Sequence, residues 1–373
     1  MIKIILYSSS QLKKIPKTGG VKRFLELVNQ MGKFCQLTLL SGDEEYPVPK
    51  EARHISMHQN KVYNKEAEYA RHNRKYLKNI KKEGYDSIVA FDVPPAIWLA
   101  LYRMPHLCLM VRKDLIGYKK IILANQKVNG IKKFCILKVF SIAELITLLY
   151  AEKIIVQCEY DRDELIKRHS VFAKCIRRKT TIQINNVNPS WAKASNAIKE
   201  RTSTKFRIVS VNGFSDYRKG CDIFLEAISN LLDKGYNIEA YIAGDGTMLS
   251  DYQKKYKKYR DIHFSGRIDK PGDYIKQFDL AVVPSRADSC PNTIMEALLN
   301  EVPVIGSNVG GIPEILADNT VLFESNAASL KEKILYCMVP ENLSRITDQQ
   351  KKRRKQLQFD WSKRIFDIIN GDK

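Results

Sequence analysis

Short apolar runs alternate with helical apolar spacing twice along the 373 residues, and this repeat constrains the fold more than any other feature. In the first half, residues 2–7, 35–40 and 107–111 are apolar runs of strand length. Residues 21–31 place apolar side chains at i, i+3, i+4 and i+7, as a core-facing helix does. Such alternation predicts a parallel sheet with helices on both faces.

The same pattern restarts after a polar break that begins near residue 185. Apolar runs recur at 206–212, 238–243, 280–284 and 302–306, and helical spacing recurs at 221–232 and 292–299. A chain of this length also exceeds the size at which a single core stops growing. We therefore predict two doubly wound, Rossmann-like α/β domains facing a central cleft, with residues 1–185 in the first, 186–204 as linker and 205–354 in the second. Ligands of such sheets bind where the strands end.

The distribution of charge and the cysteines indicate which kind of partner and which cellular compartment to expect. Residues 1–190 hold 34 basic and 17 acidic residues, whereas residues 191–373 hold 28 and 24. An asymmetry of this kind suggests that the first half faces an anionic partner, either a membrane, a nucleic acid or a phosphorylated substrate. The eight cysteines form no CxxC pair, and no run reaches the ~18 apolar residues that span a bilayer. We expect a cytoplasmic protein with free thiols.

The second half contains two acidic residues placed for sugar and ribose recognition. Asp288 precedes a predicted helix that begins near Asn292, and Glu296 lies on the first turns of that helix. The turn from Cys290 through Pro291 and Asn292 to Thr293 would expose free backbone N–H groups, which favour a diphosphate. Glu296 would then reach a ribose and Asp288 the sugar hydroxyls. The alternative is a capped helix with a solvated acidic residue.

Three further loops support an anion site in the second half. Gly213 to Gly220 follows a strand and opens a helix, and its Arg218 and Lys219 would meet phosphate charge. The turn at Gly310-Gly311 would let backbone approach a ligand closely. Residues contacting the base would come from another short strand end, at Gly266, Arg267 and Ile268.

These motifs resemble the retaining GT-B glycosyltransferases of the "glycosyl transferases group 1" family, which build bacterial surface polysaccharides and glycolipids. Asp288 and Glu296-Ala297 resemble its pair of acidic residues, and Lys219-Gly220 its diphosphate-binding lysine. Residues 243–246 and 309–314 match two further family motifs. The resemblance implies catalytic roles for Asp288, Lys219 and Glu296. It also implies that a C-terminal helix, residues 355–373, packs back on the first domain.

The first half matches the family less closely. Gly19 and Gly20 resemble the glycine-rich loop that frames the reaction centre. Where many members have Arg after the glycine that opens the diphosphate loop, this chain has Phe214, so Arg218 would supply the contact. Where many have a His near the donor sugar, this chain has residues 111–114, and either Arg112 or Asp114 would substitute.

The implied reaction moves a sugar, with retention, from a nucleotide-diphosphate donor (UDP favoured) to a hydroxyl of a lipid-linked glycan. Lys219, Arg218 and the helix N-terminus would stabilise the leaving phosphate, so we expect no metal and no other cofactor. An inactive, donor- or lipid-binding subunit of the same fold remains an alternative. A nucleic-acid-binding protein would explain the charge but lacks any recognition motif. A dehydrogenase would need a Gly-x-Gly-x-x-Gly turn after the first strand, which is absent.

A peripheral membrane location at the inner face of the plasma membrane is the last expectation. Residues 61–82 carry eight basic residues interleaved with Tyr63, Tyr69, Tyr76, Leu77 and Ile80. Helical spacing would place a modest apolar stripe beside a basic face, as in interfacial helices. Residues 118–123 and 132–134 would extend this surface. The alternative is a solvated helix in a lysine-rich protein.

Overall fold

The computed structural model of the chain describes residues 1–7, 19–41, 49, 52–56, 73–126, 128–191 and 204–371. Its contacts divide it into two compact units. Unit 1 comprises Met1–Leu123, Lys127–Ile184 and Asp360–Lys373, and unit 2 comprises Ala124–Gln126 and Asn185–Phe359. Of the expected linker, residues 192–203 lie outside the described residues.

Unit 1 is built on a parallel sheet. In its described part the strand order is β3-β2-β1-β4-β5-β6-β7, and every pairing is parallel. Strands β4 and β5 are buried along their whole length, as expected for a sheet covered on both faces. The strands are β1 (Lys3–Tyr7), β2 (Gln36–Ser41), β3 (Arg53–Ser56), β4 (Ser87–Phe91), β5 (Leu107–Val111), β6 (Lys153–Val156) and β7 (Thr180–Ile182).

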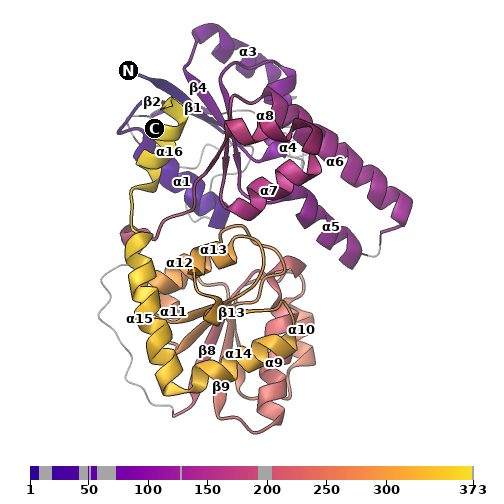
Figure 1. Ribbon diagram of the computed structural model, residues 1–373, viewed down its shortest axis with the longest axis vertical. Helices are drawn as coiled ribbons and strands as arrows, with labels where there is room; N and C mark the ends of the chain where they lie inside the picture. Colours follow the sequence, from indigo (N-terminus) through magenta and orange to yellow (C-terminus); the bar gives the residue numbers. More distant parts are fainter. Residues whose placement is uncertain are drawn as a thin grey trace. The chain divides into compact units, whose positions relative to one another are not determined.

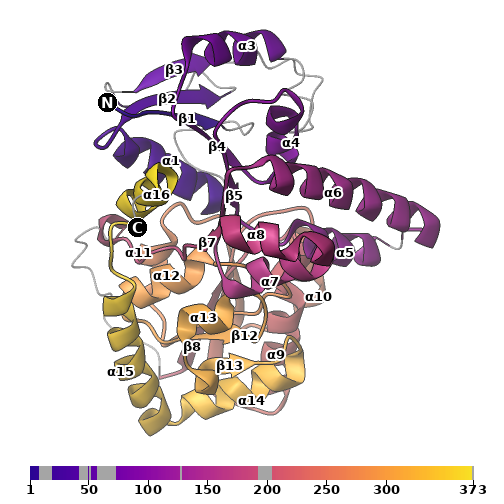
Figure 2. The same cartoon turned by 45° about the horizontal axis from the view of Figure 1, so that its top comes forward.

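The helices of unit 1 follow the strands and pack on the sheet (Figure 1). They are α1 (Gly19–Met31), α3 (Arg74–Glu83), α4 (Val93–Leu101), α5 (Leu115–Asn125), α6 (Gly130–Tyr150), α7 (Glu159–Arg168) and α8 (Ala173–Lys179), with α16 (Trp361–Asn370) added from the C-terminus. Helix α16 lies beside α1 in both views (Figures 1 and 2), and the ring of Phe366 is 5.6 Å from that of Phe34. Trp361 and Ile365 are buried there.

Unit 2 repeats the architecture with the strand order β10-β9-β8-β11-β12-β13, again parallel throughout the described pairs. Its strands are β8 (Phe206–Val211), β9 (Ile238–Ala243), β10 (Ile262–Gly266), β11 (Leu280–Val283), β12 (Val304–Ser307) and β13 (Leu322–Phe323). Its helices are α9 (Cys221–Asp233), α10 (Leu249–Lys255), α11 (Pro271–Ile275), α12 (Asn292–Leu299), α13 (Ile312–Leu316), α14 (Ala327–Met338) and α15 (Pro340–Gln356). Helix α15 packs on α12 and α14.

Both units have the strand order of a doubly wound fold, in which the direction of winding reverses next to the first strand. In unit 1 this switch point lies between β1 and β4, and in unit 2 between β8 and β11. Ligands of such sheets bind beyond the carboxyl ends of the strands at that point. The loops after β1, β4, β8 and β11 are therefore where a site is expected in each unit.

Candidate active site

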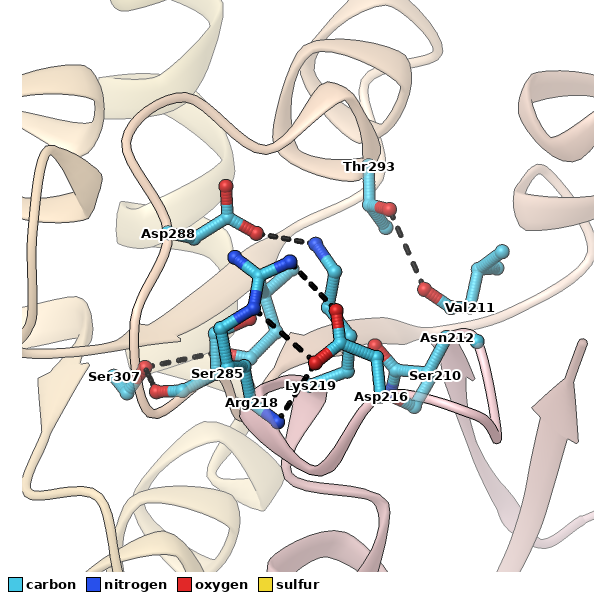
Figure 3. A network of polar contacts seen from close by, with 12 residues as sticks. Ser210, Val211, Asn212, Asp216, Arg218, Lys219, Ser285, Asp288, Thr293 and Ser307 are labelled. Atoms are coloured by element: carbon cyan, nitrogen blue, oxygen red, sulfur yellow. Dashed lines mark hydrogen bonds and ion pairs between the residues drawn. The ribbon is translucent and has the colours of Figure 1, made fainter. Parts of the chain in front are cut away.

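The switch point of unit 2 brings two predicted site residues into direct contact. Lys219 comes from the loop after β8, and Asp288 comes from the loop after β11. Lys219 Nζ donates to Asp288 Oδ2, and both side chains are partly shielded from solvent (Figure 3). The sequence assigned the lysine to phosphate and the aspartate to sugar as separate contacts. The structure shows that they neutralise each other.

A glycine permits this approach of the two loops. Gly220 has φ +66°, and a Cβ built on it would lie 1.9 Å from the carbonyl oxygen of Pro284 at the end of β11. A side chain is therefore excluded both by backbone conformation and by space. Gly220 directly follows Lys219. The close approach of the two backbones at Gly220 therefore places Lys219 beside the loop after β11, which contains Asp288.

Arg286, in the loop after β11, hydrogen-bonds the loop after β8 and the helix that follows it. Its backbone N–H donates to the Arg218 carbonyl at 2.6 Å, and its guanidinium donates to both carboxylate oxygens of Asp222 at 2.7 and 2.5 Å. The guanidinium also lies over the ring of Tyr217, 3.9 Å from the ring centre. Such a bidentate, stacked arginine has little freedom to move. The positions of Lys219 and Asp288 are thus set by a rigid frame that the sequence did not reveal.

Arg218 is held within its own loop. Its Nη2 donates to Asp216 Oδ2 at 2.6 Å, and its Nε donates to Oδ1 at 3.2 Å. The predicted phosphate contact therefore carries a carboxylate partner in this structure (Figure 3). Its neighbour Phe214, where the family often has Arg, is fully buried and packs against Tyr252 and Phe264. Because that side chain belongs to the core, position 214 presents no group to a ligand.

The turn at Gly310-Gly311 supports Asp288 rather than an open surface. Gly311 N–H donates to the Asp288 carbonyl at 3.0 Å. Gly310 has φ +56°, and a Cβ there would lie 2.1 Å from the same carbonyl oxygen. The sequence predicted that this turn lets backbone approach a ligand. The structure shows this turn in contact with the backbone of Asp288, and its contact with a ligand stays a prediction.

Helix α12 begins directly after this loop and contains Glu296. Pro291 is its N-cap residue and makes no side-chain cap hydrogen bond, and Thr293 Oγ1 donates to the Val211 carbonyl at 3.5 Å. Cys290 is buried before it. Glu296 is almost fully buried, with its Cβ 3.9 Å from where a Cβ on Gly272 of α11 would lie. A Cβ at 272 would thus be in ordinary contact with Glu296, and its tightest neighbour would be Asn300 Nδ2 at 3.1 Å.

The predicted base-contacting residues lie at the end of β10 and directly after it. Gly266 has φ +65°, and nothing lies within 4 Å of the place where its Cβ would be. Its carbonyl accepts from Gly244 N–H at 2.7 Å, which ties it to the turn after β9. The next residue, Arg267, is exposed and faces Asp269 at 3.4 Å, and Ile268 is half-buried. Open space beside a fixed backbone is compatible with a flat ligand, and Gly213 after β8 is likewise open.

The switch point of unit 1 holds a second ion pair. Asp92 follows β4 and Arg112 follows β5, and Asp92 accepts from Arg112 N–H and from Arg112 Nη2, each at 2.9 Å. Arg112 Nη1 lies 2.8 Å from where a Cβ on Gly20 would be, so this glycine of α1 leaves room for the guanidinium. Thus Gly20 and Arg112, predicted separately, lie together. Thr18 lies outside the described residues, and Gly19 begins α1.

Asp92 is a charged group held in a strained setting. It is buried, and its backbone has φ +66°, which is uncommon for any residue except glycine. Burial alone would raise the pKa of this carboxyl, but the charges of Arg112 and Lys113 and two hydrogen bonds outweigh it and lower the pKa below its ordinary value. Asp92 is the N-cap residue of α4 but makes no side-chain cap hydrogen bond. Its carboxylate orients Arg112 instead.

Asp114 does not join this cluster. Arg168 of α7 donates to Asp114 Oδ1 at 2.5 Å and to Glu144 Oε2 at 2.7 Å, and His169 lies 2.9 Å from the same Glu144 oxygen. These are buried or half-buried groups between α5, α6 and α7. The expectation that Asp114 stands in for the family's histidine is therefore corrected, because its carboxylate is committed to this inward network. Of the two candidates, Arg112 lies at the strand ends.

No group of three or more His, Cys, Asp or Glu side chains in the described part of the chain is arranged to hold a metal ion. Within the same residues, no helix has both the length and the apolar character needed to cross a bilayer.

Comparison with known proteins finds a family match within unit 2. Residues 205–339 match the family described as glycosyl transferases group 1. Protein CapJ of Staphylococcus aureus is 38% identical over 103 residues, which is 26% of each chain. The O-antigen biosynthesis glycosyltransferase WbnH of Escherichia coli is 27% identical over 109 residues, 29% of this chain and 32% of that protein. The matches thus span about a quarter to a third of these relatives.

Solved structures match the whole chain. Sucrose-phosphate synthase from Thermosynechococcus elongatus superposes with a TM-score of 0.76 at 15% identity, covering 100% of this chain and 99% of that one. HepE from Anabaena, solved with UDP and glucose, has a TM-score of 0.73 at 14% identity, covering 99% and 100%. At such identities the likeness concerns the fold. The chain therefore has the GT-B fold, and residues 205–339 of its second unit match the glycosyl transferases group 1 family.

Proposed function

We propose that the chain transfers a sugar from a nucleotide-diphosphate donor, preferably a UDP-sugar, to a hydroxyl of a lipid-linked glycan with retention at the anomeric carbon. The observation that carries this proposal is the Lys219–Asp288 pair at the switch point of unit 2. A lysine and a carboxylate beside a helix N-terminus are the groups that a diphosphate and a sugar hydroxyl require. HepE, of the same fold, was solved with UDP, which supports the choice of base.

In the proposed complex the donor diphosphate replaces Asp288 as the partner of Lys219. The released carboxylate then accepts hydrogen bonds from the sugar, and Glu296 accepts them from the ribose. Negative charge grows on the leaving phosphate as its bond to the anomeric carbon breaks, and Lys219 with the first N–H groups of α12 stabilises that charge. Arg218 joins them by leaving Asp216. Gly213, Gly266, Arg267 and Ile268 are proposed to contact the nucleoside.

Binding of the free nucleotide tests this assignment. Lys219→Ala and Glu296→Ala should each raise the dissociation constant for UDP by about 10- to 150-fold, because losing a charge-assisted hydrogen bond costs ~1.5–3 kcal/mol. Lys234→Ala, at the exposed end of α9, is the matched control and should bind UDP as the wild type does. Calorimetry that finds unchanged UDP binding in both site variants would rule out this site.

Turnover separates an active enzyme from an inactive, donor-binding subunit of the same fold. The buried Phe214, in place of the family's arginine, favours keeping that second candidate. The wild type should slowly hydrolyse one member of a panel of nucleotide sugars, and the rate should survive EDTA because the proposed charge stabilisation uses no metal. Binding without hydrolysis would favour the inactive subunit. Activity lost in EDTA and restored by Mg²⁺ would contradict metal independence.

A further inference from the structure

The first two thirds of helix α6 expose an apolar surface. Of its 21 residues, the buried ones are Glu144, Thr147 and Leu148, all in the last third. Ile131 is 78% exposed, Val139 66%, Phe134 60% and Ile142 58%. Large apolar side chains on a soluble surface usually mark a binding site when they gather in one patch.

These side chains do lie on one face. At 3.6 residues per turn they fall within an arc of about 140° around the helix axis. We call this surface the α6 face, formed by Ile131, Phe134, Cys135, Val139, Ile142 and Ile146. In both views the N-terminal half of α6 extends beyond the sheet of unit 1 (Figures 1 and 2). The described neighbours thus leave the face uncovered.

The charge around the α6 face is of one sign. Residues 115–143, which contain α5 and most of α6, include six lysines and no acidic residue. Lys138 lies within the arc of the face, with its Nζ 5.6 Å from the ring centre of Phe134. Lys119 of α5 reaches α6 similarly, 4.7 Å from the ring centre of Phe140. The apolar side chains are therefore accompanied by cations whose stems lie along apolar surface, as interfacial lysines do.

The segment that the sequence favoured first for membrane contact, residues 61–82, is different, although residues 132–134, part of its expected extension, belong to α6. Of residues 61–82, those before Asn73 lie outside the described part. In α3, Leu77 and Ile80 belong to the hydrophobic core of unit 1, so the predicted apolar stripe faces inward. The exposed face of α3 retains its lysines and Tyr76. It has charge without an apolar surface, whereas α6 has both.

We propose that the α6 face binds an anionic lipid surface, with its apolar side chains entering the interface and the lysines of α5 and α6 meeting lipid phosphates. This inference deepens the proposed function by naming the surface that would bring unit 1 to a lipid-linked acceptor. A second copy of the chain fits less well, since a symmetric pairing of this face would bring two sets of lysines together. A lipid surface supplies both the apolar phase and the opposite charge.

Vesicle binding by two matched pairs of variants tests the proposal. The first pair replaces four exposed apolar residues by Ser, either on the α6 face (Ile131, Phe134, Val139, Ile142) or elsewhere (Leu101, Val171, Tyr236, Val339). The second pair reverses three exposed cations to Glu, either near the face (Lys120, Lys132, Lys138) or on α3 (Arg74, Lys75, Lys78). Sedimentation is measured with phosphatidylcholine vesicles and with vesicles containing phosphatidylglycerol.

The wild type should bind the phosphatidylglycerol vesicles and not the neutral ones, and 0.5 M salt should weaken binding because it screens the charges. Both α6 variants should lose at least about tenfold in vesicle partitioning, since each removed apolar group or charge contributes to interfacial binding. The control variant with Ser at Leu101, Val171, Tyr236 and Val339 should bind the vesicles as the wild type does. Equal loss in the α3 variant, or no loss in either α6 variant, would overturn the proposal. UDP affinity should stay unchanged in all variants, so failure here is separable from failure of the proposed function.

A native thiol reports on the contact directly. Cys135 lies on the α6 face and is the exposed cysteine, whereas Cys175 of α8 is half-exposed and the other six are buried. An environment-sensitive fluorophore on Cys135, in a Cys175→Ser background, should shift to shorter wavelength with the anionic vesicles. The converse protein, labelled at Cys175 with Cys135→Ser, should not shift. A wild type that is dimeric without lipid and becomes monomeric in the α6-face Ser variant would assign the face to self-association instead.

Discussion

The pair of Lys219 and Asp288 gives the lysine a carboxylate partner that a diphosphate would have to displace. An opposite charge in hydrogen-bond contact is a direct competitor for the lysine. Part of the donor's binding free energy is therefore spent on separating the pair. The sugar, which in the proposed complex hydrogen-bonds the freed carboxylate, recovers part of that cost. A free nucleotide has no such group, so in the proposed complex the pair would favour the donor over the product.

Replacing Asp288 by Asn should separate these two effects. Without the competing charge, affinity for free UDP should rise by about tenfold, which corresponds to one charge-assisted hydrogen bond of ~1.5 kcal/mol. Turnover of the nucleotide sugar should fall, because the carboxylate that accepts from the sugar is gone. Calorimetry and a hydrolysis assay measure the two quantities. A parallel drop of both would argue that Asp288 holds Lys219 in place rather than competing for it.

Gly220 and Gly235 form a natural pair for measuring how closely the site loops are packed. Both have positive φ, +66° and +77°, but a Cβ at Gly220 would meet the Pro284 carbonyl and one at Gly235 would meet nothing. Gly235→Ala should cost about 1–2 kcal/mol of unfolding free energy for its backbone conformation alone. Gly220→Ala should cost more and should also weaken UDP binding, since Lys219 must move with it. Urea denaturation measures the two unfolding free energies, and calorimetry measures UDP binding. Equal losses of unfolding free energy in the two variants would contradict the close approach of the backbones at Gly220.

The elements of the fold were largely predictable because their apolar patterns are strong. Strands β5 and β9 and helix α12 have the predicted limits, and the other predicted strands differ by one or two residues. The short strands β3 and β7 were missed, since Arg53–Ser56 and Thr180–Ile182 contain few apolar residues and are strands only because a neighbouring strand offers backbone partners.

The candidate site was predictable in its residue types and not in its contacts. Lys219 and Asp288 were recognised from their local motifs, but their pairing joins positions 69 residues apart and depends on the order of β8 and β11 in the sheet. Asp92 carried no motif, and its role appears only because β4 and β5 end side by side. The frame formed by Arg286 and Asp222 was missed for the same reason.

The ion pair of Asp92 and Arg112, at the ends of β4 and β5, should make the free energy of unfolding depend on pH. The pKa of Asp92 is lowered in the folded chain, so its contribution is present above its unfolded pKa of about 3.9 and is lost as pH falls through the folded value. Asp92→Asn should therefore lower the unfolding free energy at pH 7, by about 3–5 kcal/mol for a broken buried ion pair. The difference between the wild type and the variant should narrow as pH falls below about 3.9. Urea titrations at several pH values check this, and a difference independent of pH would contradict it.

At the scale of the molecule, the C-terminal helix belongs to unit 1 although α15, which precedes it, belongs to unit 2. Trp361, Ile365 and Ile369 are buried in unit 1, and Lys153 Nζ donates to the Ile369 carbonyl at 2.5 Å. Burying each of these three side chains stabilises the folded chain by about 1.5–3 kcal/mol. Their sum is comparable to the net free energy of unfolding of a whole domain, ~5–15 kcal/mol. The last helix is thus a structural part of unit 1 rather than an appendage.

Truncation after Phe359 should consequently affect the two units unequally. Amide hydrogen exchange should accelerate in α1 and β2, whereas α9 and α12 should keep their protection and UDP should still bind. Ile365→Ala should act in the same direction with a smaller effect, and Lys363→Ala, at an exposed position, should have almost none. Loss of protection in unit 2 with unit 1 intact would contradict the assignment of α16.

The discontinuity of unit 1 has a consequence for how the protein is made. Residues 185–359 must leave the ribosome between the strands of unit 1 and its last helix. At roughly 5–20 residues per second that interval is on the order of 10–35 s, long enough for unit 2 to complete its own sheet. During it, the surface of α1 that α16 later covers has no permanent partner. The nascent chain is therefore most exposed to chaperones and proteases at its first unit, and the order of completion is the reverse of the order of synthesis.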